Sequence, residues 1–195
     1  MRSNKNLERV SDSIESETRS SKLDLHQPSR YLNSGQPAIG IIAMSQNQFV
    51  PPDGAFTKTV PIRFSHCDPA GVVYFPNYFD MFNGLIEDWY TEQLGVDYSK
   101  LIISDRHGFP YVHIETDFKI PSRMGEHLDL TLLLTRIGRS SLSVVIVGHL
   151  GGVERLRARL VTAMTSLETQ RAIELPQALR QKFEDYLRRT GPAQS

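Results

Sequence analysis

The chain has 195 residues, enough for one domain with additional segments, and its single cysteine, Cys67, excludes an intrachain disulfide. Lys plus Arg and Asp plus Glu number 22 each, so no global positive field favours a nucleic acid partner. No apolar run approaches the roughly 20 residues that cross a bilayer and no secretory signal is evident, so we expect a cytoplasmic protein without a membrane partner.

Residues 1–48 are rich in Ser, Asn, Gln, Arg and Glu, and their apolar residues follow no sustained period. A segment of this composition cannot bury enough apolar surface to offset the entropy of ordering. Acidic residues such as Glu8 and Asp12 also argue against a transit peptide, because transit peptides are poor in acids. We therefore expect a disordered N-terminal extension over 1–48 and one folded domain over 49–190.

The first periodic segment of that domain predicts a strand followed by a long helix. Val60, Ile62 and Phe64 alternate with polar or exposed positions, which is the period of a half-buried strand. Asn77 is the expected N-cap of the helix, and Gly95 lies where a left-handed C-terminal cap is expected. The helical spacing of three and four residues is carried by Phe79, Phe82, Leu85, Ile86, Trp89, Tyr90 and Leu94.

Four further strands and a closing helix are expected after the long helix. Apolar residues alternate over 112–120, 128–134 and 156–164, and the run over 142–147 is apolar on both faces, as in a central strand. A closing helix is expected over about 176–189. Strands joined in this order form one antiparallel sheet, and only the long helix can cover its apolar face. The sequence therefore predicts an α+β domain.

The loop between the first strand and the long helix carries a specific motif. Residues 64–78 read Phe-Ser-His-Cys-Asp-Pro-Ala-Gly-Val-Val-Tyr-Phe-Pro-Asn-Tyr. This segment strongly resembles the active-site signature of the 4-hydroxybenzoyl-CoA thioesterase family, and weaker similarity extends over about 57–186. The resemblance implies the hotdog fold, in which a curved antiparallel sheet, here five-stranded, wraps around a long central helix.

The resemblance also implies roles for individual residues. Asp68 matches the catalytic carboxylate, and the backbone N–H of Phe75 matches the donor that polarises the thioester carbonyl. Such a donor at a helix N-terminus is worth on the order of 10²- to 10³-fold in rate. Asp68 could act as a nucleophile through a mixed anhydride or as a general base on water. Gly71 is expected to set the turn that positions Asp68.

Substrate contacts follow from the same resemblance. We expect them from Tyr74, Asn77 and Tyr78 in the motif, and from Asn83 further along the helix. A carboxylate can occupy the Asn83 region in aryl-CoA members, where it holds a ring hydroxyl. Arg139 lies at a strand turn where relatives carry basic residues that meet the coenzyme A phosphates, although a solvated turn arginine is an equally good interpretation. The implied assembly is a homodimer with sites at its interface, and beyond that a homotetramer.

The expected reaction is hydrolysis of a small, aromatic, hydroxybenzoyl-type acyl-CoA without a cofactor or metal. Two alternatives stay open, namely a thioesterase for short aliphatic acyl-CoA or acyl carrier protein and a non-catalytic acyl-CoA-binding protein. Cys67 could be a thiol nucleophile with His66 as its base, but neighbours in an extended chain point to opposite faces. The histidines show no spacing typical of a metal site.

Overall fold

The structure is a computed structural model, and it describes residues 48–191. We expected a disordered extension over residues 1–48. All of that segment except residue 48 lies outside the described range, so the expectation stays a prediction. The larger elements are β1 (Phe56–Pro61), α2 (Phe75–Asp88), β3 (Tyr111–Phe118), β4 (His127–Ile137), β5 (Ser141–Leu150), β6 (Val153–Ala163) and α4 (Gln177–Thr190). Shorter ones are the 3₁₀ turn Phe64–His66, the π-helical turn Trp89–Gln93, α3 (Tyr98–Ile103), β2 (His107–Gly108), β7 (Thr165–Ser166) and β8 (Arg171–Ala172).

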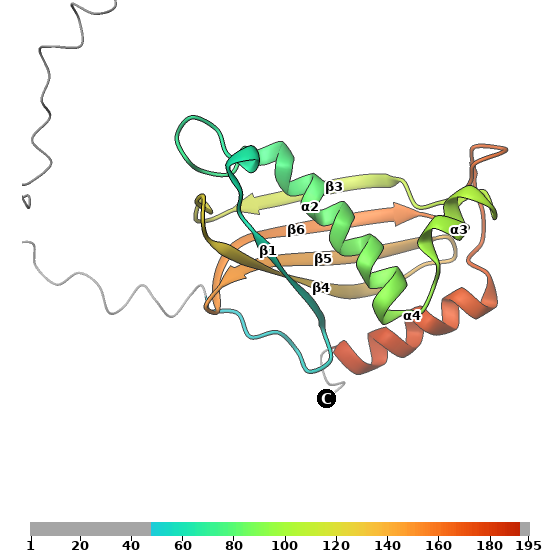
Figure 1. Cartoon of the computed structure of the whole chain (residues 1–195). Helices are drawn as coiled ribbons and strands as arrows, with labels where there is room; N and C mark the ends of the chain where they lie inside the picture. Colours follow the sequence, from blue (N-terminus) through green and yellow to red (C-terminus); the bar gives the residue numbers. More distant parts are fainter. Residues whose placement is uncertain (1–47, 192–195) are drawn as a thin grey trace, which may run out of the picture. The chain divides into compact units, whose positions relative to one another are not determined.

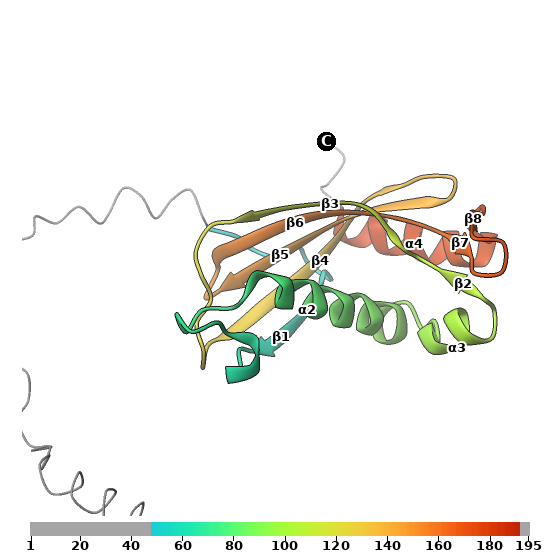
Figure 2. The ribbon, with the colours of Figure 1, turned by 90° about the horizontal axis from the view of Figure 1, so that it is seen from above.

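Five antiparallel strands form one sheet in the order β1-β4-β5-β6-β3, and the sheet curves around α2 (Figures 1 and 2). The predicted α+β class and the predicted hotdog fold are both confirmed. The alternation read from the sequence decides which face meets the helix. Leu132 pairs with Ile146, which pairs with Ala158, and all three are fully buried beneath the helix. Period-two apolar residues on three adjacent strands therefore build one side of the core.

Helix α2 supplies the other side of the core with its apolar face. It begins at Phe75, two residues before the predicted N-cap Asn77, so that cap assignment is wrong. Pro76 does not delay the start, because a proline in the first turn lacks only an N–H that would have no intrahelical partner anyway. After Asp88 the backbone continues as the π-helical turn, and Gly95 follows with a φ of 60°, in the left-handed region predicted for it. No helix within residues 48–191 is long and apolar enough to cross a membrane.

The C-terminal end of α2 is packed by elements that the sequence only partly predicted. The closing helix α4 was expected, and its Phe183 stacks on Trp89 with ring centroids 5.7 Å apart. The short helix α3 was not expected, and neither was the second sheet, β2-β7-β8. These elements cluster beside the α2 end that lies far from the loop after β1 (Figure 2).

Strand β3 differs from its neighbours because it lies at an open edge of the sheet. It pairs with β6 on one side only. A register irregularity between Tyr111 and His113 interrupts the alternation, and side chains on both faces of the strand are accessible. Val112, Ile114 and Phe118 are 61%, 41% and 49% exposed. The apolar pattern that predicted a half-buried strand is therefore present, but a single copy of the chain does not bury it.

Candidate active site

The Asp68 side chain is carried by a tight turn. Cys67 and Val73 form an isolated antiparallel bridge, and between them the Gly71 N–H donates to the Asp68 carbonyl at 2.9 Å. Asp at the first, Pro at the second and Gly at the fourth position are the residues that the commonest β-turn favours. Gly71 has a φ of 74°, which favours glycine. The Ala70 N–H donates to Asp68 Oδ1 at 2.8 Å, so the carboxylate is held in one orientation by its own turn.

The start of α2 leaves one backbone donor free. The Tyr74 N–H donates to the His66 carbonyl and the Asn77 N–H donates to the Tyr74 carbonyl, each at 2.9 Å. Pro76 has no N–H, and no side chain caps the helix. Within residues 48–191 the Phe75 N–H makes no backbone hydrogen bond outside the helix. A free N–H at a helix N-terminus can donate to an oxygen on which negative charge develops.

The predicted substrate residues of the motif divide into two kinds. The Asn77 amide donates to the His66 carbonyl at 2.9 Å and thereby ties the loop to the helix. Tyr78 is 4% exposed, and its ring packs 5.5 Å from that of Phe118. Tyr74, in contrast, is half exposed beside the turn. Asn77 and Tyr78 therefore hold the start of α2 against the neighbouring loop and strand. A substrate contact by any of the three residues stays a prediction.

Asn83 and Arg139 lie away from this turn. Asn83 is eight positions after Phe75, which corresponds to about 12 Å along the helix. Arg139 is exposed in the β4–β5 turn. The opposite end of β4 lies beside the loop that leads to Asp68, because the Ile62 N–H donates to the Glu126 carbonyl at 2.8 Å. The length of β4 separates these two ends by about 33 Å. One copy of the chain therefore does not bring Asp68 and Arg139 together.

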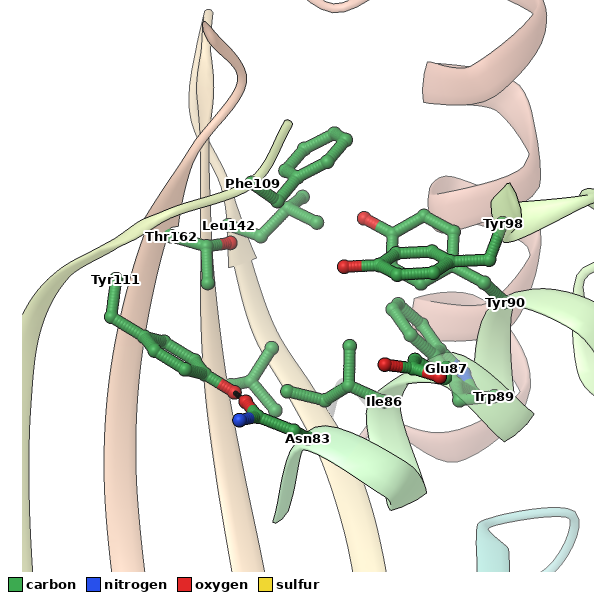
Figure 3. Close-up of a pocket in the computed structure, with 11 residues that line it drawn as sticks. Asn83, Ile86, Glu87, Trp89, Tyr90, Tyr98, Phe109, Tyr111, Leu142 and Thr162 are labelled. Carbon is green, nitrogen blue, oxygen red and sulfur yellow. Dashed lines mark hydrogen bonds between the residues drawn. The ribbon is translucent and has the colours of Figure 1, made fainter. Parts of the chain in front are cut away.

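A cavity of about 260 Å³ lies beside Asn83 (Figure 3). Leu142 in its wall follows Arg139 by three residues, so the cavity lies at the β4–β5 turn end of the sheet. Its wall combines residues of α2, the π-helical turn, α3, β5 and β6 with Phe109 and Tyr111. Of these residues the sequence analysis singled out only Asn83 for substrate binding. Glu87 follows Asn83 by one helical turn, a spacing that could have indicated it. No local pattern indicated Tyr98 or Tyr111, because they reach the cavity only through the tertiary fold.

The alternative nucleophile is poorly placed for activation. Cys67 Sγ lies 3.5 Å from the Arg63 carbonyl oxygen, and His66 Nδ1 accepts the Arg63 N–H at 3.1 Å. The imidazole is thus engaged with the backbone of its own turn and not with the thiol. A Cys-His pair needs the two side chains within hydrogen-bond reach, so this arrangement does not support thiol catalysis.

Strand β6 carries three arginines at alternate positions, Arg155, Arg157 and Arg159, and neighbouring carboxylates neutralise them. Arg155 pairs with Glu126, Arg157 with Glu154 in a bidentate arrangement, and Arg159 with Asp117. These guanidinium groups are already paired with carboxylates, which argues against a phosphate site. Within the part of the chain that the structure describes, no group of three or more His, Cys, Asp and Glu side chains could hold a metal ion.

Sequence comparison and structure comparison both find thioesterases and CoA hydrolases among the proteins that this chain resembles. A 1,4-dihydroxy-2-naphthoyl-CoA hydrolase of Nostoc punctiforme is 32% identical over 87 residues, covering 43% of this chain and 56% of that protein. A hydrolase of the same name from Crocosphaera subtropica is 25% identical over 131 residues, covering 64% of this chain and 95% of that protein. The first match therefore spans little more than half of its relative's length.

Solved structures resemble the chain over most of their own length. A thioesterase superfamily protein of Jannaschia sp. is 25% identical, with a TM-score of 0.65 over 70% of this chain and 95% of that one. A 1,4-dihydroxy-2-naphthoyl-CoA thioesterase of Synechocystis is 24% identical, with a TM-score of 0.60 over 68% of this chain and 97% of that one, and this likeness supports the fold. The family profile described as Thioesterase-like superfamily matches residues 62–183, more than half of the sequence. The chain therefore belongs to the thioesterase-like superfamily.

Proposed function

We propose that the chain hydrolyses a small aromatic acyl-coenzyme A to the free acid and coenzyme A. The observation that carries this proposal is the Asp68 carboxylate, held by its turn, seven residues before a helix start at which the Phe75 N–H has no hydrogen-bond partner among residues 48–191. Thioester hydrolysis needs one group for the attack and one donor for the developing oxyanion. The curated relatives support an aromatic acyl group, because they are named for a naphthoyl-CoA substrate.

Asp68 can drive the reaction by either of two routes. As a general base it accepts a proton from water while the water oxygen attacks the carbonyl carbon. The C–S bond then breaks, and the thiolate of coenzyme A takes up the proton. As a nucleophile it forms a bond to the carbonyl carbon as the C–S bond breaks, which gives a mixed anhydride and the thiolate of coenzyme A. Water then hydrolyses the anhydride, which restores the Asp68 carboxylate, and the proton that water gives up is taken by the thiolate. In both routes the Phe75 N–H holds the carbonyl oxygen and Gly71 keeps the turn that aims the carboxylate.

The proposed enzyme is a homodimer in which two β3 edges pair. An open edge with exposed apolar side chains is a template for another strand. Val112, Ile114 and Phe118 provide that apolar surface. Pairing about a two-fold axis is antiparallel, so the Tyr111 end of one β3 lies beside the Phe118 end of the other.

This pairing supports a site that uses both copies. The Phe118 end of β3 lies beside the Asp68 loop, since the Val73 N–H donates to the Ser122 carbonyl at 2.9 Å shortly after that strand. The Tyr111 end lies at the Arg139 end of the sheet, where Leu142 and Thr162 pair. In this antiparallel pairing, Arg139 of one copy therefore lies at the same end of the interface as the partner's Asp68. We assign Arg139 to the coenzyme A phosphates, because its guanidinium is exposed and permanently charged.

Release of free thiol from a panel of thioesters tests the proposal. The panel contains benzoyl-CoA, 4-hydroxybenzoyl-CoA, 1,4-dihydroxy-2-naphthoyl-CoA and butyryl-CoA, and we expect at least one aromatic member to be cleaved faster than butyryl-CoA. Asp68→Asn keeps the size of the side chain but removes its charge. It should lower kcat by at least about 10²-fold with little change in KM.

Circular dichroism must show that the Asp68→Asn protein is folded. A folded variant that retains more than about a tenth of the wild-type kcat would refute a catalytic role for this carboxylate. Cys67→Ala serves as the control, because the geometry around that thiol predicts no loss beyond a packing effect.

A further inference from the structure

The β3–β4 loop, residues 119–126, is bonded to the segment that joins the proposed catalytic turn to α2. The Val73 N–H donates to the Ser122 carbonyl at 2.9 Å, and the Met124 N–H donates to the Gly71 carbonyl at 3.2 Å. This segment sets the separation between the reacting carboxylate and the start of α2. A displacement of the loop therefore changes the geometry of the site.

The same loop is also bonded to the chain that enters the turn. The Ile62 N–H donates to the Glu126 carbonyl at 2.8 Å, and the Gly125 N–H donates to the Ile62 carbonyl at 2.9 Å. Both arms of the turn are therefore hydrogen-bonded to one loop. The tip of the turn lies in solvent, since Pro69 and Ala70 are exposed.

Arg155 on β6 holds this loop through its side chain. Its Nη1 donates to the Pro121 carbonyl at 3.1 Å, and its Nη2 lies 3.4 Å from Glu126 Oε1. Glu126 Oε2 in turn accepts the Arg123 N–H at 2.8 Å. The Arg155 and Glu126 side chains are only 16% and 25% exposed, so solvent screens their attraction less than that of a surface pair. One guanidinium and one carboxylate thus hold the loop near both of its ends.

The contacts of Arg155 differ from those of the other two arginines of β6. Arg157 pairs with Glu154 of its own strand, and Arg159 pairs with carboxylates of β3. Among these three arginines, only Arg155 is bonded to the β3–β4 loop in the described chain. Strands β3 and β6 are already paired through their backbones. The Arg155 side chain therefore acts on the loop and not on the pairing of the sheet.

We infer that Arg155 and Glu126 are positioning residues, which hold the β3–β4 loop and through it the Asp68 carboxylate in place relative to the Phe75 N–H. The inference rests on the proposed thioesterase function and assigns neither residue a contact with substrate. A misplacement of about 1 Å between reacting groups can cost about 10²-fold in rate. Loss of the pair should therefore act on the chemical step more than on binding.

Arg155→Met tests this role, because methionine keeps an unbranched apolar side chain but makes neither contact. We expect kcat to fall by about 10-fold or more on the aromatic thioester that the wild type cleaves best, with KM within about threefold of the wild-type value. Arg155→Lys should restore part of the kcat, since an ammonium keeps the charge but does not reproduce the fork of a guanidinium. Circular dichroism checks the fold of both proteins.

Glu126→Gln gives the same comparison if Arg155→Met does not fold. The glutamine oxygen can still accept the Arg123 N–H, but the charge that faces Arg155 is lost. Its kcat should fall with little change in KM. A folded Arg155→Met or Glu126→Gln protein with kcat within about threefold of the wild-type value overturns the inference.

Arg180→Met is the matched control. Arg180 is 22% exposed, pairs with Glu184, and donates through Nη2 to the Gly138 and Arg139 carbonyls at 2.8 and 3.1 Å. It thus holds a loop by the same kinds of contact, but at the other end of β4. Its variant should keep the wild-type kcat, and any effect on catalysis should appear in KM through Arg139. Equal losses of kcat in Arg155→Met and Arg180→Met would reflect general destabilisation and would overturn the inference.

The Asp68→Asn background tests whether Arg155 acts through the carboxylate. Once the carboxylate is absent, its misplacement has no further effect, so adding Arg155→Met should lower the residual rate by less than about threefold. Rates are measured with enzyme in excess. Losses that multiply would show that Arg155 acts elsewhere and would overturn the inference.

The outcomes also separate the inference from the proposed function. An Arg155→Met protein with wild-type kcat, beside an Asp68→Asn protein that has lost its activity, overturns the inference and leaves the proposed function standing. A wild type that cleaves none of the thioesters of the panel overturns both.

Discussion

Gly71 and Gly54 share a φ of 74°, and in each case an added Cβ would meet no atom within 4 Å. Only Gly71 belongs to the turn that carries Asp68. Alanine at either position should cost roughly 1 to 2 kcal/mol of stability, because the left-handed conformation is strained for a side chain. We expect Gly71→Ala also to lower kcat, since relief of this strain moves the Asp68 carboxylate.

Urea unfolding and steady-state kinetics on both variants separate the two effects. Gly54→Ala should show the same loss of stability with wild-type kcat. Equal kcat for the two variants would mean that the conformation of Gly71 does not position Asp68.

Because His149 is buried, it makes the free energy of unfolding depend on pH. It is 5% exposed, its Nε2 lies 2.9 Å from Thr131 Oγ1, and its Nδ1 is buried without a partner in the described chain. Burial lowers the pKa of His149 from 6.5, and Asp129 only partly offsets this. The unfolded chain therefore takes up a proton at higher pH than the folded one. Stability from this group is complete above about pH 6.5 and is lost as the pH falls toward the lower folded pKa.

The free energy of unfolding, measured by urea at pH 7.5 and at pH 5.5, tests this expectation. His149→Gln can keep the hydrogen bond to Thr131 but does not titrate, so the difference between the two pH values should shrink. His127→Gln, at an exposed position of β4 away from the proposed interface, should leave the difference unchanged. If both variants behave alike, burial of His149 does not control the acid sensitivity.

At the scale of elements, one tyrosine of α4 joins two strands. The Phe56 N–H donates to the Tyr186 hydroxyl at 3.0 Å, and that hydroxyl donates to the Leu132 carbonyl at 2.6 Å. Tyr186 is fully buried, so Tyr186→Phe leaves an N–H and a carbonyl without partners. Each such group costs about 1 to 3 kcal/mol. We expect a loss of at least about 2 kcal/mol in urea unfolding with unchanged kcat at 25 °C. A melting temperature equal to that of the wild type would contradict this role.

Elements with a strong local pattern could be predicted from the sequence. The buried faces of β4 and β6 follow from strict alternation, and the turn at Asp68 follows from Asp68, Pro69 and Gly71, which favour a tight turn at these positions. The start of α2 was misplaced, because Pro76 reads equally well as a residue before a helix or within its first turn.

The cavity could not be predicted in the same way. Glu87 and Asn83 share a helix face, but Tyr98 and Tyr111 join them only because α3 and β3 fold back against α2. Periodicity records which face of an element is buried, and it does not record which element covers that face. The sequence therefore located the proposed reacting carboxylate, but not the tyrosines that line the cavity.

At the scale of the whole molecule, the two edges of the sheet differ. On β1 the exposed surface is polar, with Lys58 paired to Asp88 and Glu92, and Pro61 lies at its end. These features are typical of an edge protected against further pairing. On β3 the apolar side chains Val112, Ile114 and Phe118 are exposed, and no described element covers the edge. The asymmetry predicts that association uses β3 and that the proposed activity depends on this association.

Ile114→Lys tests this dependence, because a lysine at the β3 edge puts like charges from two copies into one apolar contact. Sedimentation should show a shift from dimer to monomer, and circular dichroism should show a retained fold, since Ile114 is already 41% exposed in one copy. Thiol release should fall with the dimer fraction and recover at high protein concentration, because the proposed site uses both copies. Thr59→Lys, at an exposed position of β1, is the control and should stay dimeric and active. A monomeric Ile114→Lys protein with full activity would show that one copy holds the complete site.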